Sequence, residues 1–103
     1  MGFWDLKTLK LDEFRRGIWS KLESGTNLTM AFMEIAPNTE GSPHDHPLDQ
    51  CGIVIAGEIE MSVGEEKKWL RPMETYFIPS GAKHNWKTVR ASAKILDVVP
   101  KQG

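Results

Sequence analysis

Residues 44–50 read His-Asp-His-Pro-Leu-Asp-Gln, and residues 79–84 read Pro-Ser-Gly-Ala-Lys-His. His44, His46 and His84 are the three histidines of the chain. Imidazole is the commonest protein ligand for a transition metal, and its neutral form is available near neutral pH. A chain that places every histidine in these two stretches is therefore predicted to build a metal site.

The spacing within the first stretch identifies a fourth candidate ligand. If residues 44–50 are extended, His44, His46 and Gln50 share one face, because side chains alternate along a strand. Asp49 has the opposite parity and is a poor candidate. His84 has to arrive from another strand, and the Pro-x-Gly turn before it fixes its angle. Three imidazoles and an amide oxygen leave one or two positions open on an octahedral ion, as a catalytic site requires.

The rest of the sequence is typical of a protein built from strands. Short β-compatible runs recur roughly every ten residues and are separated by Gly or Pro, which favours an antiparallel sandwich or barrel. Residues 9–16 are compatible with one helical turn or with an edge strand. Strands are expected at residues 17–19, 29–35, 52–56, 58–63, 67–70, 75–78, 85–89 and 94–99.

Length and composition limit the classes of protein to consider. A chain of 103 residues predicts one domain, residues 1–103, with a modest core that favours a homodimer. The net charge of −1 provides no basic face for nucleic acid and no polybasic membrane anchor. No apolar run approaches the ~20 residues of a spanning helix. Cys51 is the single cysteine and the N-terminus lacks a signal-peptide pattern, so a cytoplasmic location is expected.

Taken together, the two stretches resemble the motifs of the cupin family of small jelly-roll barrels. The resemblance implies an all-β fold, a cupin-type antiparallel jelly-roll β-barrel. Gly41 and Thr88 depart from the family spacing and identity, and Met73-Glu74 replaces the usual Gly-Asp. The positions that match are His44, His46, Gly57, Pro79, Gly81 and His84.

Gln50 is the most informative departure from the family pattern, because it stands where cupins usually have a Glu ligand. A neutral amide leaves the metal its full formal +2 charge, which predicts a stronger Lewis acid and weaker metal retention. Imidazole-rich ligands favour one divalent transition metal, Zn, Mn, Fe, Ni or Co, over Mg or Ca. Two alternatives stay open: Gln50 orients a water beside the ion, or the chain is a degenerate cupin without a metal.

Asp97 lies inside the apolar run Ile95–Val99. A carboxylate in such a strand has to be paired, hydrogen-bonded or protonated. It is therefore a candidate catalytic acid or base at the barrel mouth, with a pKa raised by burial. The alternative is a structural role, with an arginine or a backbone amide as its partner.

Two neighbours of the predicted ligands have simpler interpretations. Trp86 should share the face of His84, where it either lines the pocket or packs in the core. Cys51 is expected to be a small buried hydrophobic residue.

The local string His46 to Gln50 is similar to that of small cupins that act on unsaturated uronates from pectin and alginate breakdown. This resemblance implies conversion of a ring-form unsaturated monouronate to its linear keto form, with the metal as Lewis acid and Asp97 moving a proton. Val99 stands where that group has an aromatic residue, a departure that bears on substrate anchoring. The alternatives are a metal-dependent dioxygenase and a non-catalytic module that binds or senses a small ligand.

Overall fold

The computed structural model describes residues 2–101, and these residues contain strands and no helix. The all-β prediction is therefore confirmed. Within this part of the chain, nothing helical is long and apolar enough to cross a lipid bilayer. The strands are β1 (Asp12–Arg15), β2 (Ile18–Ser24), β3 (Leu28–Ile35), β4 (Gln50–Gly57), β5 (Ile59–Val63), β6 (Glu66–Leu70), β7 (Thr75–Ile78), β8 (His84–Lys87) and β9 (Ala93–Pro100).

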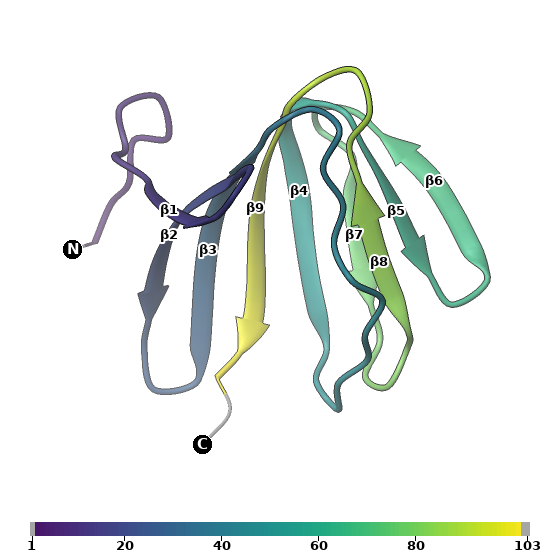
Figure 1. The fold of residues 1–103 in the computed structure, drawn as a ribbon. Coiled ribbons are helices and arrows are strands. Elements are labelled where there is room, and N and C mark those ends of the chain that lie inside the picture. Colours follow the sequence, from purple (N-terminus) through teal and green to yellow (C-terminus); the bar gives the residue numbers. More distant parts are fainter. Residues whose placement is uncertain (1, 102–103) are drawn as a thin grey trace.

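The strands form two antiparallel sheets that lean toward each other (Figure 1). The larger sheet has the order β1-β2-β3-β9-β4-β7, and the smaller sheet has the order β6-β5-β8. The last long strand, β9, is inserted between β3 and β4, so segments far apart in sequence become neighbours. This crossover is what brings Asp97 on β9 opposite Gly52 on β4.

The space between the sheets is filled by the inward-facing residues of each strand. Ile35, Val54, Ile59, Ile78 and Ile95 are each at most 3% exposed. Alternation along the strands explains this, since every second side chain of a half-buried strand points to the same face. Burying an aliphatic side chain of this size contributes about 1.5–3 kcal/mol. The core therefore holds the two sheets in a fixed relation around the site.

The observed strands match the expected ones within a few residues, with two differences. Residues 9–16 contribute the edge strand β1, so the helical-turn alternative is wrong. The strand expected at residues 17–19 extends to Ser24 as β2, paired along its whole length with β3. Its C-terminal half is exposed and, apart from Leu22, polar, because it is part of a hairpin near the sheet edge, which removes the apolar pattern.

The segment from residue 40 to residue 49 crosses beside β8 without forming a strand of its own (Figure 1). Isolated bridges join Glu40 to Lys87 and His44 to His84. The extended strand assumed for residues 44–50 is therefore wrong, because Gln50 alone of the candidate ligands in that stretch lies in a regular strand, β4.

Candidate metal centre

Backbone hydrogen bonds bring the His44–His46 segment to the start of β8. The amide of His44 donates to the carbonyl of His84 (3.1 Å), and the amide of His84 donates back (2.9 Å). The amide of Gly81 donates to the carbonyl of His46 (2.8 Å). Gly81 has φ +84°, a left-handed conformation that glycine adopts without strain. The Pro-x-Gly turn therefore positions both His46 and His84.

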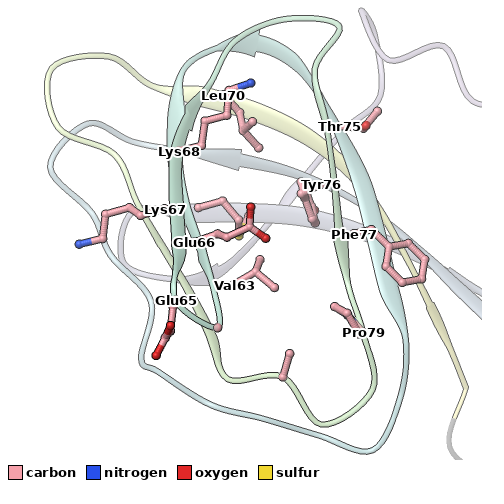
Figure 2. A pocket seen from close by; sticks show the side chains of 13 residues that line it. Val63, Glu65, Glu66, Lys67, Lys68, Leu70, Thr75, Tyr76, Phe77 and Pro79 are labelled. Atoms are coloured by element: carbon pink, nitrogen blue, oxygen red, sulfur yellow. The ribbon is translucent and has the colours of Figure 1, made fainter.

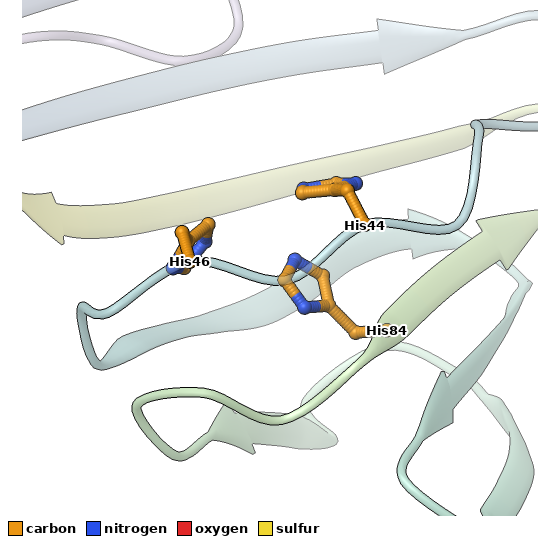
Figure 3. Close-up of side chains that lie close together, drawn as sticks. All are labelled: His44, His46 and His84. Carbon is orange, nitrogen blue, oxygen red and sulfur yellow. The ribbon is translucent and has the colours of Figure 1, made fainter.

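The three imidazoles converge in the space between the sheets (Figure 3). Their ring centroids lie 5.7 Å (His44–His46), 4.1 Å (His44–His84) and 4.9 Å (His46–His84) apart. One nitrogen from each ring can be chosen so that all three lie within 4.8 Å of one another. Donors on a common ion are about 3.0–3.4 Å apart for metal–nitrogen bonds of ~2.1 Å, so small ring rotations would close the cluster on a cation.

Backbone carbonyls fix the tautomers of two of these rings. Nδ1 of His44 lies 2.9 Å from the carbonyl of Ser42, and Nδ1 of His84 lies 3.0 Å from that of Ala82. A carbonyl only accepts, so both Nδ1 atoms carry the proton and both Nε2 atoms keep a lone pair. Nε2 of His84 is buried without a hydrogen-bond partner. A cation is the partner that such a buried lone pair lacks, so the residues present fit a metal.

Gln50 extends the cluster from β4. Its Oε1 lies 3.0 Å from Nε2 of His46. This separation suits a hydrogen bond, and it equally suits two adjacent donors on an octahedral ion, which are about 3.0 Å apart. Nδ1 of His46 is buried and has no partner. The structure therefore brings together His44, His46, His84 and Gln50.

Asp97 holds the other end of the Gln50 amide. Nε2 of Gln50 donates to both carboxylate oxygens of Asp97, at 3.0 Å and 2.8 Å. The hydroxyl of Tyr76 donates to Oδ2 of the same carboxylate. Asp97 is 6% exposed, and its partners are an amide and a phenol rather than an arginine. The expected alternative of an arginine or backbone partner for Asp97 is therefore wrong.

Burial dominates the electrostatics of this region. It raises the pKa of Asp97 above 3.8, although the hydrogen bonds from Tyr76 and Gln50 act in the opposite direction. It also raises the pKa of Tyr76, with a further contribution from the negative charge of Asp97. The pKa of His84 is lowered below 6.5, mainly because burial disfavours the imidazolium form. His84 therefore remains neutral, the form that binds a metal, to a lower pH than an exposed histidine.

Comparison with known proteins identifies the family. The family described as the cupin domain matches residues 31–99, which include every candidate site residue. The chain is a cupin. Among solved structures, KdgF from Halomonas sp. superposes with a TM-score of 0.86 at 22% identity, covering 100% of this chain and 96% of that one. The polyketide cyclase RemF from Streptomyces resistomycificus gives 0.85 at 19% identity, covering 99% and 80%. Both superpositions confirm the jelly-roll fold.

One curated relative resembles the cupin in sequence as well. H2HPP isomerase from Bacillus subtilis is 30% identical over 84 residues, which are 75% of this chain and 35% of that protein. This cupin therefore spans about a third of the length of that relative.

Tyr76 belongs to this site through a contact with Asp97 that the sequence analysis did not predict. The alternation Thr75-Tyr76-Phe77-Ile78 places Tyr76 inward with Ile78, and a buried tyrosine hydroxyl usually has a hydrogen-bond partner. This pattern, together with the carboxylate of Asp97 in an apolar strand, was the sequence signal that could have indicated a hydrogen bond between the two side chains. Gly52 completes the arrangement, because a Cβ at this position would overlap the Tyr76 hydroxyl.

Two side chains flank the predicted ligands in the cupin without joining them. Trp86 is half-buried and packs against the core. Cys51 is exposed, so the expectation that it is buried is wrong. Its outward position follows from its register, which places it opposite Phe77 and Val98.

A cavity of about 590 Å³ opens between β6 and β7 (Figure 2). Its wall includes Val63, Leu70 and the ring of Tyr76, with Lys67 and Lys68 on β6. None of the four candidate ligands lines it. Tyr76 thus belongs both to this cavity and, through its hydroxyl, to the candidate site.

Proposed function

We propose that this cupin binds one divalent transition metal (Zn, Mn, Fe, Ni or Co) through His44, His46, Gln50 and His84. The observation that carries the proposal is the convergence of three imidazoles, with a buried and unpartnered Nε2 on His84. Tautomers set by backbone carbonyls support it, because second contacts of this kind orient metal-binding histidines.

We further propose that the site is catalytic rather than structural. His44 is exposed, whereas His84 is buried, so the cluster is accessible from the His44 side. Structural metal sites are closed by protein ligands, and catalytic sites keep a position for water or substrate. A small molecule with oxygen donors would approach from this open side.

The reaction class we propose is an isomerase- or lyase-type conversion of a small oxygen-rich substrate, such as the opening of an unsaturated uronate ring to a keto form. A bound divalent metal supplies Lewis-acid polarisation of a substrate oxygen. Asp97 is our candidate for the group that moves the proton, and its raised pKa suits that role. The isomerase name of the curated relative supports this reaction class.

Metal analysis tests the proposal directly. We expect native protein to contain about one equivalent of a transition metal, and the variant His46→Ala to contain none while retaining its strand circular dichroism. The physical reason is the loss of an imidazole donor whose Nε2 lies 3.0 Å from Oε1 of Gln50. Stoichiometric metal in His46→Ala would show that His46 is not a ligand.

The reaction class is tested by a substrate screen with the native metal restored. Unsaturated monouronates, small acids, sugars and diketones are incubated with native protein and with Asp97→Asn. Isomerisation or elimination without oxygen consumption is the expected result. Oxygen consumption with iron would identify a dioxygenase instead, and saturable ligand binding without turnover would identify a binding or sensor module.

We also propose that residues 1–103 form one domain that acts as a cytoplasmic homodimer, without a nucleic-acid or membrane partner. The strand registers place Trp19, Leu28 and Phe77 on one face of the larger sheet, opposite the core face, and these side chains are 36%, 55% and 60% exposed. A second copy would cover this face. Light scattering should give twice the monomer mass, and Phe77→Lys should lower it; a monomeric native protein would contradict the proposal.

A further inference from the structure

We infer that Gln50 and Asp97 act as one unit, an amide backed by a carboxylate, in the place where most cupins have a single carboxylate ligand. We call these two residues the amide–carboxylate pair. The inference rests on the proposed metal site and adds to it a positioning role for Asp97 and for Tyr76. It also modifies the prediction of a stronger Lewis acid, which was based on the neutral Gln50 alone. The negative charge that residue 50 lacks is carried by Asp97, one hydrogen bond farther from the ion.

Hydrogen-bond polarity fixes the orientation of the Gln50 amide. An ionised carboxylate only accepts hydrogen bonds, so the end of the amide that faces Asp97 must be the NH₂ group. The Nε2 atom is shared by both carboxylate oxygens, at 3.0 Å and 2.8 Å. The carbonyl end then faces the histidines, where Oε1 lies 3.0 Å from Nε2 of His46. The carboxylate thus orients Gln50 so that its oxygen, a potential metal ligand, faces the histidines and its NH₂ group, a hydrogen-bond donor, does not.

Tyr76 holds the carboxylate in place. Its hydroxyl donates to Oδ2 of Asp97, and it fits there because Gly52 on the neighbouring strand has no side chain. This hydrogen bond fixes the orientation of the carboxylate, so that its oxygens keep facing the Gln50 amide. Tyr76 and Gln50 therefore both donate to Asp97, and the amide oxygen of Gln50 is directed to the histidine cluster.

No lysine or arginine of the described residues forms a salt bridge with Asp97. The salt bridges found within residues 2–101 all involve other carboxylates, and Asp97 is 6% exposed. A buried charge without an opposite charge is costly. The histidine cluster is the part of its surroundings where a cation would be held, so a divalent ion there would balance the carboxylate through the amide.

The pair explains why a glutamate would not suit position 50 in this chain. A carboxylate at the position of the Gln50 amide would lie about 3 Å from that of Asp97, and two such groups cannot both be ionised. Exchanging the amide and the carboxylate between positions 50 and 97 should, in contrast, be tolerated. In Gln50→Glu combined with Asp97→Asn, the negative charge moves to the ligand position and the amide moves behind it.

A double-mutant cycle over these two positions tests the inference. Gln50→Glu, Asp97→Asn and the double variant are compared with native protein by urea unfolding in EDTA and by Co²⁺ titration followed in the visible spectrum. We expect Asp97→Asn to weaken Co²⁺ binding by about 10–100-fold, as loss of an outer contact to a ligand does. The double variant should recover most of the loss in both measurements. Additive effects of the two single variants would overturn the pair.

The positioning role of Tyr76 is tested in the same cycle with Tyr76→Phe, which removes only the hydroxyl. We expect it to weaken Co²⁺ binding and shift the Co²⁺ spectrum in the native background, and to do neither in the Asp97→Asn background. Equal effects in both backgrounds would show that Tyr76 acts independently of the carboxylate and overturn this role.

The two measurements separate the inference from the proposed function. If native protein binds no Co²⁺, the proposed metal site fails, and with it the ligand role of the pair. Coupling between positions 50 and 97 in EDTA would then still establish the hydrogen-bonded pair by itself. If native protein binds Co²⁺ but the two positions do not couple, the metal site stands and the pair is overturned.

Discussion

At the scale of single residues, the candidate site depends on groups that have no metal-binding chemistry of their own. Gly52 is the clearest case, because it makes room for the Tyr76 hydroxyl that contacts Asp97. A Cβ at residue 52 would also meet the carbonyl of Leu96 at 2.7 Å, and a backbone atom cannot easily move away. The identity of this residue therefore affects both packing and the hydrogen bonds behind Gln50.

Gly52→Ala should consequently destabilise the metal-free protein by about 1–3 kcal/mol, as overpacking of a filled interior does. It should also weaken Co²⁺ binding, because Tyr76 has to withdraw from Asp97. Urea unfolding in EDTA and Co²⁺ titration measure the two effects. Gly25→Ala is the matched control, since its Cβ would have ordinary contact only, at 4.0 Å from the carbonyl of Leu28. Equal stability of the two variants would contradict this account.

At the scale of elements, the sequence predicted the strands well because alternation and turn residues are local features. Residues 29–35 and 75–78 are strands within one residue of the expected bounds. The sequence could not predict that residues 44–49 would be irregular, because their path is set by non-local hydrogen bonds to β8. The histidines were identified by type and spacing, whereas the hydrogen bond from Tyr76 to Asp97 was not predicted, because this contact arises only when β7 and β9 flank β4.

At the scale of the whole molecule, stability and metal binding are linked through protons. The pKa of His84 is lower in the folded protein than 6.5, because burial disfavours its charged form. Between pH 6.5 and that lowered pKa, the unfolded chain binds a proton at this position that the folded chain does not. The contribution of His84 to the free energy of unfolding is therefore fully present above pH 6.5 and is lost as the pH falls through the folded pKa. Asp97 has the opposite sign, because its pKa is raised above 3.8 and its protonated form is favoured on folding.

We therefore expect the metal-free native protein, between about pH 7.5 and about pH 5, to show a loss of stability on acidification that His84→Asn lacks. The variant keeps an amide donor near the position of Nδ1, which contacts the carbonyl of Ala82, and lacks the titrating ring. Urea unfolding in EDTA at several pH values gives the two slopes, and their difference isolates His84 because Asp97 is common to both proteins. Identical slopes would show that His84 titrates alike in the folded and unfolded states. With Co²⁺ bound, the native protein should respond to acid more steeply, since protons then compete with the ion for every imidazole that holds it.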